Sequence, residues 1–119
     1  PNMVLPGDKC SKRSSTKEIA KMTIRCIKEN VPFEVPGIAF LSGGQSEIEA
    51  TENLNEINKI NDTKFILSFS YGRALQQGAL KNWGKDQEDI SNTQKIFSKR
   101  SKMNGLASAG QWLKELENK

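Results

Sequence analysis

The segment 35–46 constrains the fold of this chain more than any other stretch. Its first part is apolar and short, which predicts a buried strand over residues 37–42. Two glycines and two hydroxyl side chains follow, and an acidic stretch with helical periodicity begins directly after them. A strand, a glycine turn and a helix start, in that order, present backbone N–H groups and a helix N-terminus to an anion.

Residues 42–46, Ser-Gly-Gly-Gln-Ser, are the centre of this junction. Glycine permits a positive φ and a close approach of the backbone to a ligand, so successive amides can form an anion nest here, with the Ser42 hydroxyl as a further donor. The alternative is an ordinary turn in which Ser46 caps the following helix. Residues 41–45 also spell the signature of ABC-transporter ATPase domains. Because the chain lacks both a GxxxxGK[ST] loop and an acidic residue at the end of the next strand, we interpret this match as accidental.

A second junction of the same kind lies downstream. The apolar residues 65–70 predict another strand, and Gly72 and Arg73 follow it. A guanidinium group offers a planar fork of donors to phosphate oxygens, so Arg73 is either a phosphate clamp or a solvated arginine in the first helical turn. An arginine in that turn opposes the helix dipole, which favours a role other than helix stability. We predict that the two junctions face one phosphate.

Hydrophobic periodicity predicts an alternation of helices and strands along the chain. Capping boxes that begin at Ser15 and Ser46 start helices over 15–30 and 46–60. We expect further helices over 74–83, ended by Gly84, and over 86–104, ended by Gly105, and then a weakly helical, exposed tail over 106–119. The alternation implies parallel strands with right-handed crossovers. Two strands do not form a sheet that stands alone, so either residues 1–4 end a third strand or the other strands lie elsewhere in the protein.

Several side chains near the second strand have two interpretations. Ser68 and Ser70 alternate with an apolar residue, which puts both hydroxyls on one face of the strand. In a closed barrel that face points inward, near the ligand; otherwise the hydroxyls are ordinary hydrogen-bonded groups. We expect Tyr71 to pack in the interior, Trp83 to act as an aromatic anchor, and Trp112 to make a surface or interface contact.

The residue types of the chain exclude several classes of function. There is no histidine, so neither a Ser-His-Asp nor a Cys-His set can be assembled. Cys10 and Cys26 match no zinc spacing, and without a hydrophobic signal segment we expect reduced thiols in a cytosolic chain and no metal. The net charge of +4 favours anionic ligands weakly, but the sequence has no run of like charges that would indicate nucleic-acid binding. No apolar run reaches the roughly 18 residues of a membrane span.

Several stretches together resemble class I fructose-1,6-bisphosphate aldolases in their order and spacing. They are Pro1-Asn2-Met3-Val4 with Pro6-Gly7, Val31-Pro32, Gly37-Ile38 with residues 40–46, Asn53-Leu54-Asn55 with Ile57-Asn58-Lys59, residues 68–76, and Ala79-Leu80 with Trp83-Gly84. The resemblance covers nearly the whole chain. It implies an α/β fold, the last three βα units of a (β/α)₈ TIM barrel, with residues 37–42 and 65–70 as strands seven and eight. Phosphate sites in that fold commonly lie in the loops after these strands.

By matching positions, the resemblance also implies which residues bind one phosphate of the substrate. They are Ser42, Gly43, Gly44, Ser70, Gly72 and Arg73. The implied reaction is the reversible cleavage of fructose 1,6-bisphosphate to dihydroxyacetone phosphate and glyceraldehyde 3-phosphate through a lysine Schiff base, with no metal or other cofactor. In the family that lysine immediately precedes the Pro-Asn-Met stretch, so we expect no catalytic residue within this segment.

The resemblance therefore predicts that residues 1–119 are the C-terminal portion of a single TIM-barrel domain, with the C-terminal tail region beginning near residue 106. It further implies a cytoplasmic homotetramer whose partners are the rest of the aldolase chain, fructose 1,6-bisphosphate and triose phosphates, without nucleic acid or membrane insertion. A binding role toward actin or acidic cytoplasmic tails is the alternative from another class. A fragment of an ABC ATPase is the third.

Overall fold

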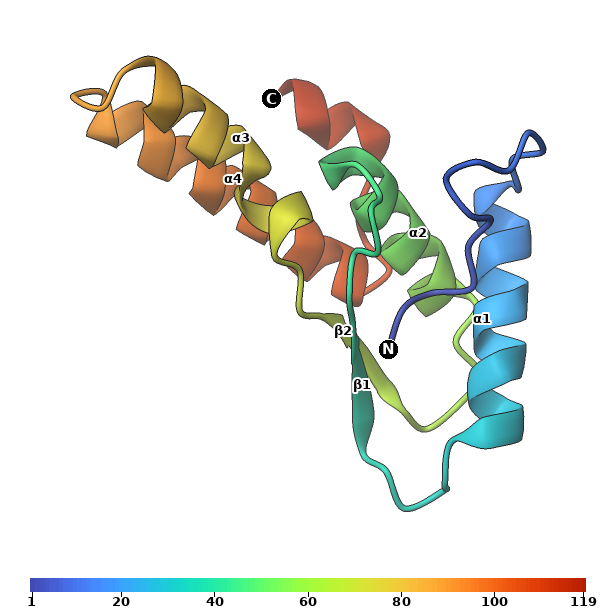
Figure 1. Cartoon of the computed structure of the whole chain (residues 1–119). Coiled ribbons are helices and arrows are strands. Elements are labelled where there is room, and N and C mark those ends of the chain that lie inside the picture. Colours follow the sequence, from blue (N-terminus) through green and yellow to red (C-terminus); the bar gives the residue numbers. More distant parts are fainter.

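The computed structural model describes residues 1–119 as two short strands with helices around them (Figure 1). In chain order the elements are α1 (Thr16–Asn30), β1 (Gly37–Phe40), α2 (Glu47–Lys59), β2 (Ile66–Phe69), α3 (Arg73–Lys85), α4 (Ile90–Ser108) and the 3₁₀ helix η1 (Lys114–Asn118). Figure 1 shows α1 and α2 together beside the strands, whereas α3 and α4 form a hairpin that extends away from them. None of the helices has both the length and the apolar composition needed to cross a bilayer.

The two strands pair in parallel, as predicted from the alternation of elements. Gly37 lies opposite Ile66, and the register continues to Phe40 opposite Phe69. The first residues of the chain lie on the other side of β1, where Asn2 forms a parallel bridge with Leu41. The Leu41 N–H donates to the Pro1 carbonyl at 2.8 Å. Residues 1–4 therefore lie where a third strand would end beside β1, which is one of the two predicted alternatives.

Both predicted capping boxes are present, and they fix where α1 and α2 begin. The Glu18 N–H donates to the Ser15 hydroxyl at 3.2 Å, and the Ser15 N–H donates to the Glu18 carboxylate at 2.9 Å. Ser46 and Glu49 exchange the same two bonds at 3.2 and 2.9 Å. Each box satisfies two of the N–H groups that a helix start leaves without partners.

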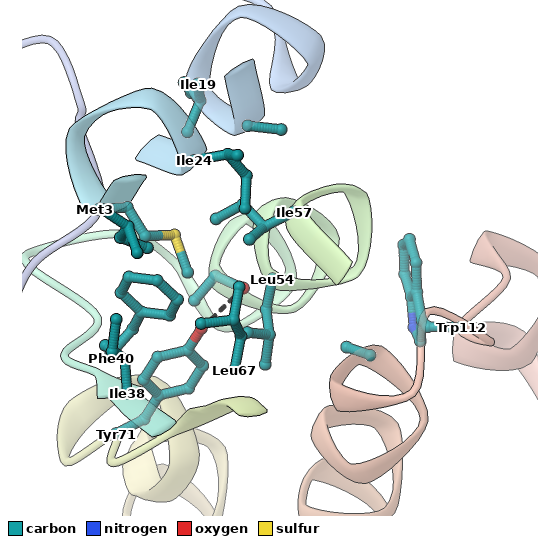
Figure 2. Close-up of a cluster of buried hydrophobic side chains, with 14 of the residues drawn as sticks. Met3, Ile19, Ile24, Ile38, Phe40, Leu54, Ile57, Leu67, Tyr71 and Trp112 are labelled. Atoms are coloured by element: carbon teal, nitrogen blue, oxygen red, sulfur yellow. Dashed lines mark hydrogen bonds between the residues drawn. The ribbon is translucent and has the colours of Figure 1, made fainter. Parts of the chain in front are cut away.

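The core lies between one face of the strand pair and the helices α1 and α2, and it extends to Ala74 of α3 and to Met103 and Ala107 of α4 (Figure 2). Phe40 and Leu67 point from the strands toward Leu54 and Ile57 of α2, and all four side chains are almost completely buried. The buried Tyr71 hydroxyl donates to the Ala50 carbonyl at 3.0 Å, so Tyr71 packs in the interior as expected. Burial raises the pKa of Tyr71 above its ordinary value.

The other face of the strand pair is open. Ile66 is 73% exposed and Leu41 is 53% exposed, while Ala39 is exposed between them. In a parallel α/β sheet both faces are normally covered. The strand pair therefore has one packed face and one bare, mostly apolar face.

The C-terminal third differs from the prediction in its helix boundaries. α3 continues through Gly84 to Lys85, and α4 begins only at Ile90, with Asp89 as its N-cap. α4 also continues past Gly105 to Ser108. The predicted stop at Gly105 was wrong, because glycine lowers the stability of a helix but does not end it. The buried side chains of Met103 and Ala107, on either side of Gly105, stabilise the helix across this position.

The two tryptophans have the opposite environments from those predicted. Trp112 is only 4% exposed and packs in the hydrophobic core. Its backbone N–H donates to the Asn55 side chain and its indole N–H donates to Glu117, each at 2.9 Å. Trp83 is 47% exposed and is not an anchor. Residues 106–119 are accordingly not an exposed tail, since they begin inside α4 and end in η1 against the body of the protein.

Candidate anion-binding site

The turn after β1 has the backbone geometry that its two glycines permit. Gly43 has φ +58° and Gly44 has φ +84°, which are positive values that other residues adopt only with strain. The Gln45 N–H closes the turn on the Ser42 carbonyl at 3.1 Å. The N–H groups of Gly43 and Gly44 donate to no backbone carbonyl, so both are available to a ligand.

Side chains from α2 and its approach hold this turn in place. The Gln45 amide donates to the Ser42 carbonyl at 2.8 Å, and the Asn53 amide donates to the Gln45 side-chain oxygen at 2.7 Å. Ser42 is 7% exposed and Asn53 is also buried. The turn is therefore connected to the second helix by a continuous chain of hydrogen bonds.

The start of α3 provides a second group of free donors. Gly72 is the N-cap residue and offers no side-chain cap. The N–H groups of Leu75 and Gln76 both donate to the Gly72 carbonyl at 3.1 Å, whereas those of Arg73 and Ala74 reach no backbone carbonyl. A helix start with unbonded N–H groups is a favourable position for an anion.

The two junctions meet at one surface hollow of about 380 Å³. Four of the six residues predicted to bind phosphate line it: Ser42, Gly43, Gly72 and Arg73. Arg73 is the only charged residue of its lining, so the hollow is basic. The arrangement can hold a small anion between backbone amides on one side and a guanidinium group on the other.

The other two predicted residues lie beside the hollow. Gly44 lines a separate depression together with Gly43, Asp8 and Arg13. Ser70 is exposed at the end of β2, and its N–H donates to the Phe40 carbonyl at 2.8 Å. This bond keeps the ends of the two strands together next to the residues Leu41 and Ser42 that line the hollow.

Two lining residues, Asn2 and Leu41, were not identified from the sequence. A Cβ atom at Gly43 would clash with the side-chain oxygen and nitrogen of Asn2. The glycine therefore makes room for Asn2 as well as allowing the positive φ. Asn2 lies within a stretch that carried the family resemblance, but its position depends on the pairing of residues 1–4 with β1.

No cluster of three or more histidine, cysteine, aspartate or glutamate side chains has the geometry to hold a metal ion. The free cysteines Cys10 and Cys26 are both exposed, and neither lines the hollow. The chemistry that this chain offers near the two junctions is thus anion recognition by amides, a hydroxyl group and a guanidinium group.

The family model described as "Glycolytic: Fructose-bisphosphate aldolase class-I" matches residues 1–119 of the sequence. This chain belongs to the class I fructose-bisphosphate aldolase family. Among curated relatives of this aldolase-family chain, fructose-bisphosphate aldolase 4, cytosolic, of Arabidopsis thaliana is 50% identical over 92% of the chain and 28% of its own length. Fructose-bisphosphate aldolase B of Sparus aurata is 50% identical over 94% of the chain and 31% of its own length.

A solved structure extends the similarity of this aldolase-family chain from sequence to fold. Fructose-bisphosphate aldolase from Plasmodium falciparum, in a ternary complex with TRAP and a small-molecule inhibitor, superposes with a TM-score of 0.90 at 40% identity. The alignment covers 95% of this chain and 33% of that one. The α/β fold is thus that of an aldolase, and the chain spans about a third of the length of the relatives that it matches.

Proposed function

We propose that residues 1–119 are the C-terminal portion of a class I fructose-bisphosphate aldolase and that their two junctions bind one phosphate group of its sugar phosphates. The observation that carries this proposal is the hollow shared by Ser42, Gly43, Gly72 and Arg73. Amides at a glycine turn bind phosphate oxygens through preformed dipoles, and a guanidinium group adds charge-assisted hydrogen bonds. Gly44 supplies a further free amide, and Ser70 a hydroxyl group at the end of β2.

The reaction that we propose is the reversible cleavage of fructose 1,6-bisphosphate to dihydroxyacetone phosphate and glyceraldehyde 3-phosphate. The Schiff-base lysine of the family would immediately precede Pro1, so we assign residues 1–119 to substrate binding and none of them to catalysis. By fixing a phosphate group at one end of the substrate, these residues would hold the reacting carbon atoms in a defined place. That is the part of catalysis this segment can perform.

We further propose that β1 and β2 are strands seven and eight of a TIM barrel and that residues 1–4 follow strand six. The parallel order of Asn2, β1 and β2 supports this assignment. So does the bare face with Ile66 and Leu41, because the inward face of a barrel is filled by side chains from the other strands. The location in the cytoplasm and the assembly as a homotetramer are part of the same proposal.

A titration of the isotope-labelled chain tests the phosphate site directly. Inorganic phosphate and fructose 1,6-bisphosphate are added separately while the amide resonances are followed by NMR. We expect the amides of Gly43, Gly44 and Arg73 to shift with either ligand, and Arg73→Ala to weaken binding about tenfold or more. Arg25→Ala is the matched control, because Arg25 is an exposed arginine paired with Glu29 on α1, and its removal changes the net charge equally.

The alternative binding role has a separate test. The solved Plasmodium falciparum aldolase is in complex with TRAP, and the net charge of +4 is compatible with an acidic protein partner for this chain. If actin or an acidic cytoplasmic tail binds at the phosphate hollow, fructose 1,6-bisphosphate should displace it. Retention of the partner at saturating sugar phosphate would assign it to another surface.

A further inference from the structure

Glu47 connects α2 and α3, the helices that follow the two junctions. It is the first residue of α2, directly after the cap Ser46, and its carboxylate accepts the N–H of Gly78 in α3 at 2.9 Å. No cation lies within ion-pair distance of Glu47. The link to Gly78 is therefore the one hydrogen bond that the Glu47 side chain makes.

The glycine at position 78 is explained by this contact. Glycine is unfavourable in a helix interior, yet Gly78 lies well inside α3. A Cβ atom there would lie 3.1 and 3.2 Å from the two carboxylate oxygens of Glu47 and 3.2 Å from the Ile96 side chain of α4. Three helices thus meet at Gly78, and the missing side chain lets the carboxylate reach the backbone.

The link adds a polar contact to a helix start that apolar packing already holds, since Ala74 is fully buried in the core. Gly72 precedes the helix with no side-chain cap and with open space around it. The bonds from Tyr71 to Ala50 and from Ser70 to Phe40 fix the chain before Gly72. Beyond Gly72, Ala74 holds the first turn of α3 against the core by packing alone, which is not directional. Glu47 fixes α3 beyond that point, on the same helix that begins with Arg73.

We propose that Glu47 is a positioning residue for the anion site: its bond to the Gly78 amide holds α3, and with it Arg73, in place relative to the Gly43–Gly44 turn. The inference rests on the proposed phosphate-binding function. Glu47 itself does not line the hollow that contains Arg73. It acts through the relative placement of two helices, each of which begins at one of the two junctions.

Three substitutions separate the hydrogen bond from the charge. Glu47→Gln removes the charge and keeps an oxygen that can accept the Gly78 N–H, whereas Glu47→Ala removes both. Glu47→Asp keeps the charge on a side chain too short to reach. We expect Ala and Asp to weaken the binding of inorganic phosphate about tenfold, and Gln to bind within about threefold of the native chain. Glu56→Ala is the matched control, because Glu56 lies on the same helix and its side chain makes no hydrogen bond.

A double variant with Arg73 tests whether Glu47 acts through Arg73, because a general loss of stability would not depend on Arg73. If Glu47 acts through Arg73, the double variant Glu47→Ala, Arg73→Ala binds phosphate as weakly as Arg73→Ala alone. Hydrogen exchange at the Gly78 amide should accelerate in the Ala and Asp variants but not in the Gln variant. The inference would be overturned if the losses of phosphate affinity in the two single variants multiplied in the double variant. Equal phosphate affinity of the Glu47→Ala and Glu47→Gln variants would also overturn it. Absence of phosphate binding by the native chain would instead overturn the proposed function, and the inference with it.

Discussion

Arg100 of α4 and Glu117 of η1 form a bidentate ion pair, with both nitrogen–oxygen distances at 2.9 Å. Each side chain is only 10% exposed, and the Trp112 indole N–H donates to the same carboxylate. The Arg100 guanidinium also reaches the buried Thr51 hydroxyl of α2 at 3.3 Å. The Glu117 carboxylate thus binds the last residues of the chain to α4 directly and to α2 through Arg100.

Glu117→Ala is expected to destabilise the chain by about 3 kcal/mol, because it leaves the Arg100 guanidinium buried without its counter-ion. The free energy of unfolding from urea titration measures this loss. Glu115→Ala is the control, since Glu115 is exposed in the same 3₁₀ helix. A loss below about 1 kcal/mol would place the pair in the range of surface ion pairs.

Gly43→Ala is expected to abolish detectable phosphate binding and to cost about 1–2 kcal/mol of stability. The left-handed conformation is strained for alanine, and the new Cβ displaces the Asn2 side chain. Phosphate titration and urea unfolding measure the two effects. Gly7→Ala is the control, because Gly7 has no neighbour within 4 Å of a Cβ and no positive φ. Unchanged phosphate affinity in Gly43→Ala would remove this turn from the site.

The cap of α1 should make stability depend on acid pH. The hydrogen bond from the Ser15 backbone, and then the one from its hydroxyl, lower the pKa of Glu18 below its ordinary value of 4.5. A carboxylate with a lowered folded-state pKa stabilises the protein above the unfolded value, and this contribution is lost as the pH falls through the folded value. Urea midpoints between pH 6 and pH 3 should therefore fall less steeply in Glu18→Gln than in the native chain. If the urea midpoints of Glu18→Gln and of the native chain fell equally with pH, this prediction would be contradicted.

The two tryptophans should respond differently to a quencher. In Trp83→Phe the remaining emission comes from the buried Trp112, so acrylamide should quench it weakly. In Trp112→Phe the emission comes from the exposed Trp83, and quenching should be strong. Adding Glu117→Ala to Trp83→Phe should raise the quenching, since Trp112 then loses its hydrogen-bond partner. Equal quenching of the two single variants would contradict the observed burial.

Local signals predicted the parts of the fold that depend on neighbouring residues. The capping boxes at Ser15 and Ser46 and the positive φ of Gly43 and Gly44 involve contacts within a few residues, and all are present. The predictions of the end of α4 and of an exposed Trp112 were wrong, because both features depend on residues that are distant in sequence. Trp112 packs in the core and donates to Asn55, which lies 57 residues away in sequence.

The same distinction applies to the candidate site. Each junction could be recognised from its own glycines, and the parallel pairing of β1 and β2 brings Ser42 and Gly43 next to Gly72 and Arg73. Asn2 carried no local signal of its own, since its place in the hollow follows from pairing with Leu41. The role inferred for Glu47 likewise depends on a contact between two helices that no periodicity encodes.

The open face of the strand pair has a consequence for handling this polypeptide. Ile66, Leu41 and Ala39 form an exposed apolar patch on the open face of the strand pair, and such patches favour self-association. The chain should remain monomeric in dilute solution at low ionic strength, whereas concentrated solutions of the chain should become turbid through aggregation. We therefore expect self-association to begin at this small apolar patch and not at the charged exterior of the helices.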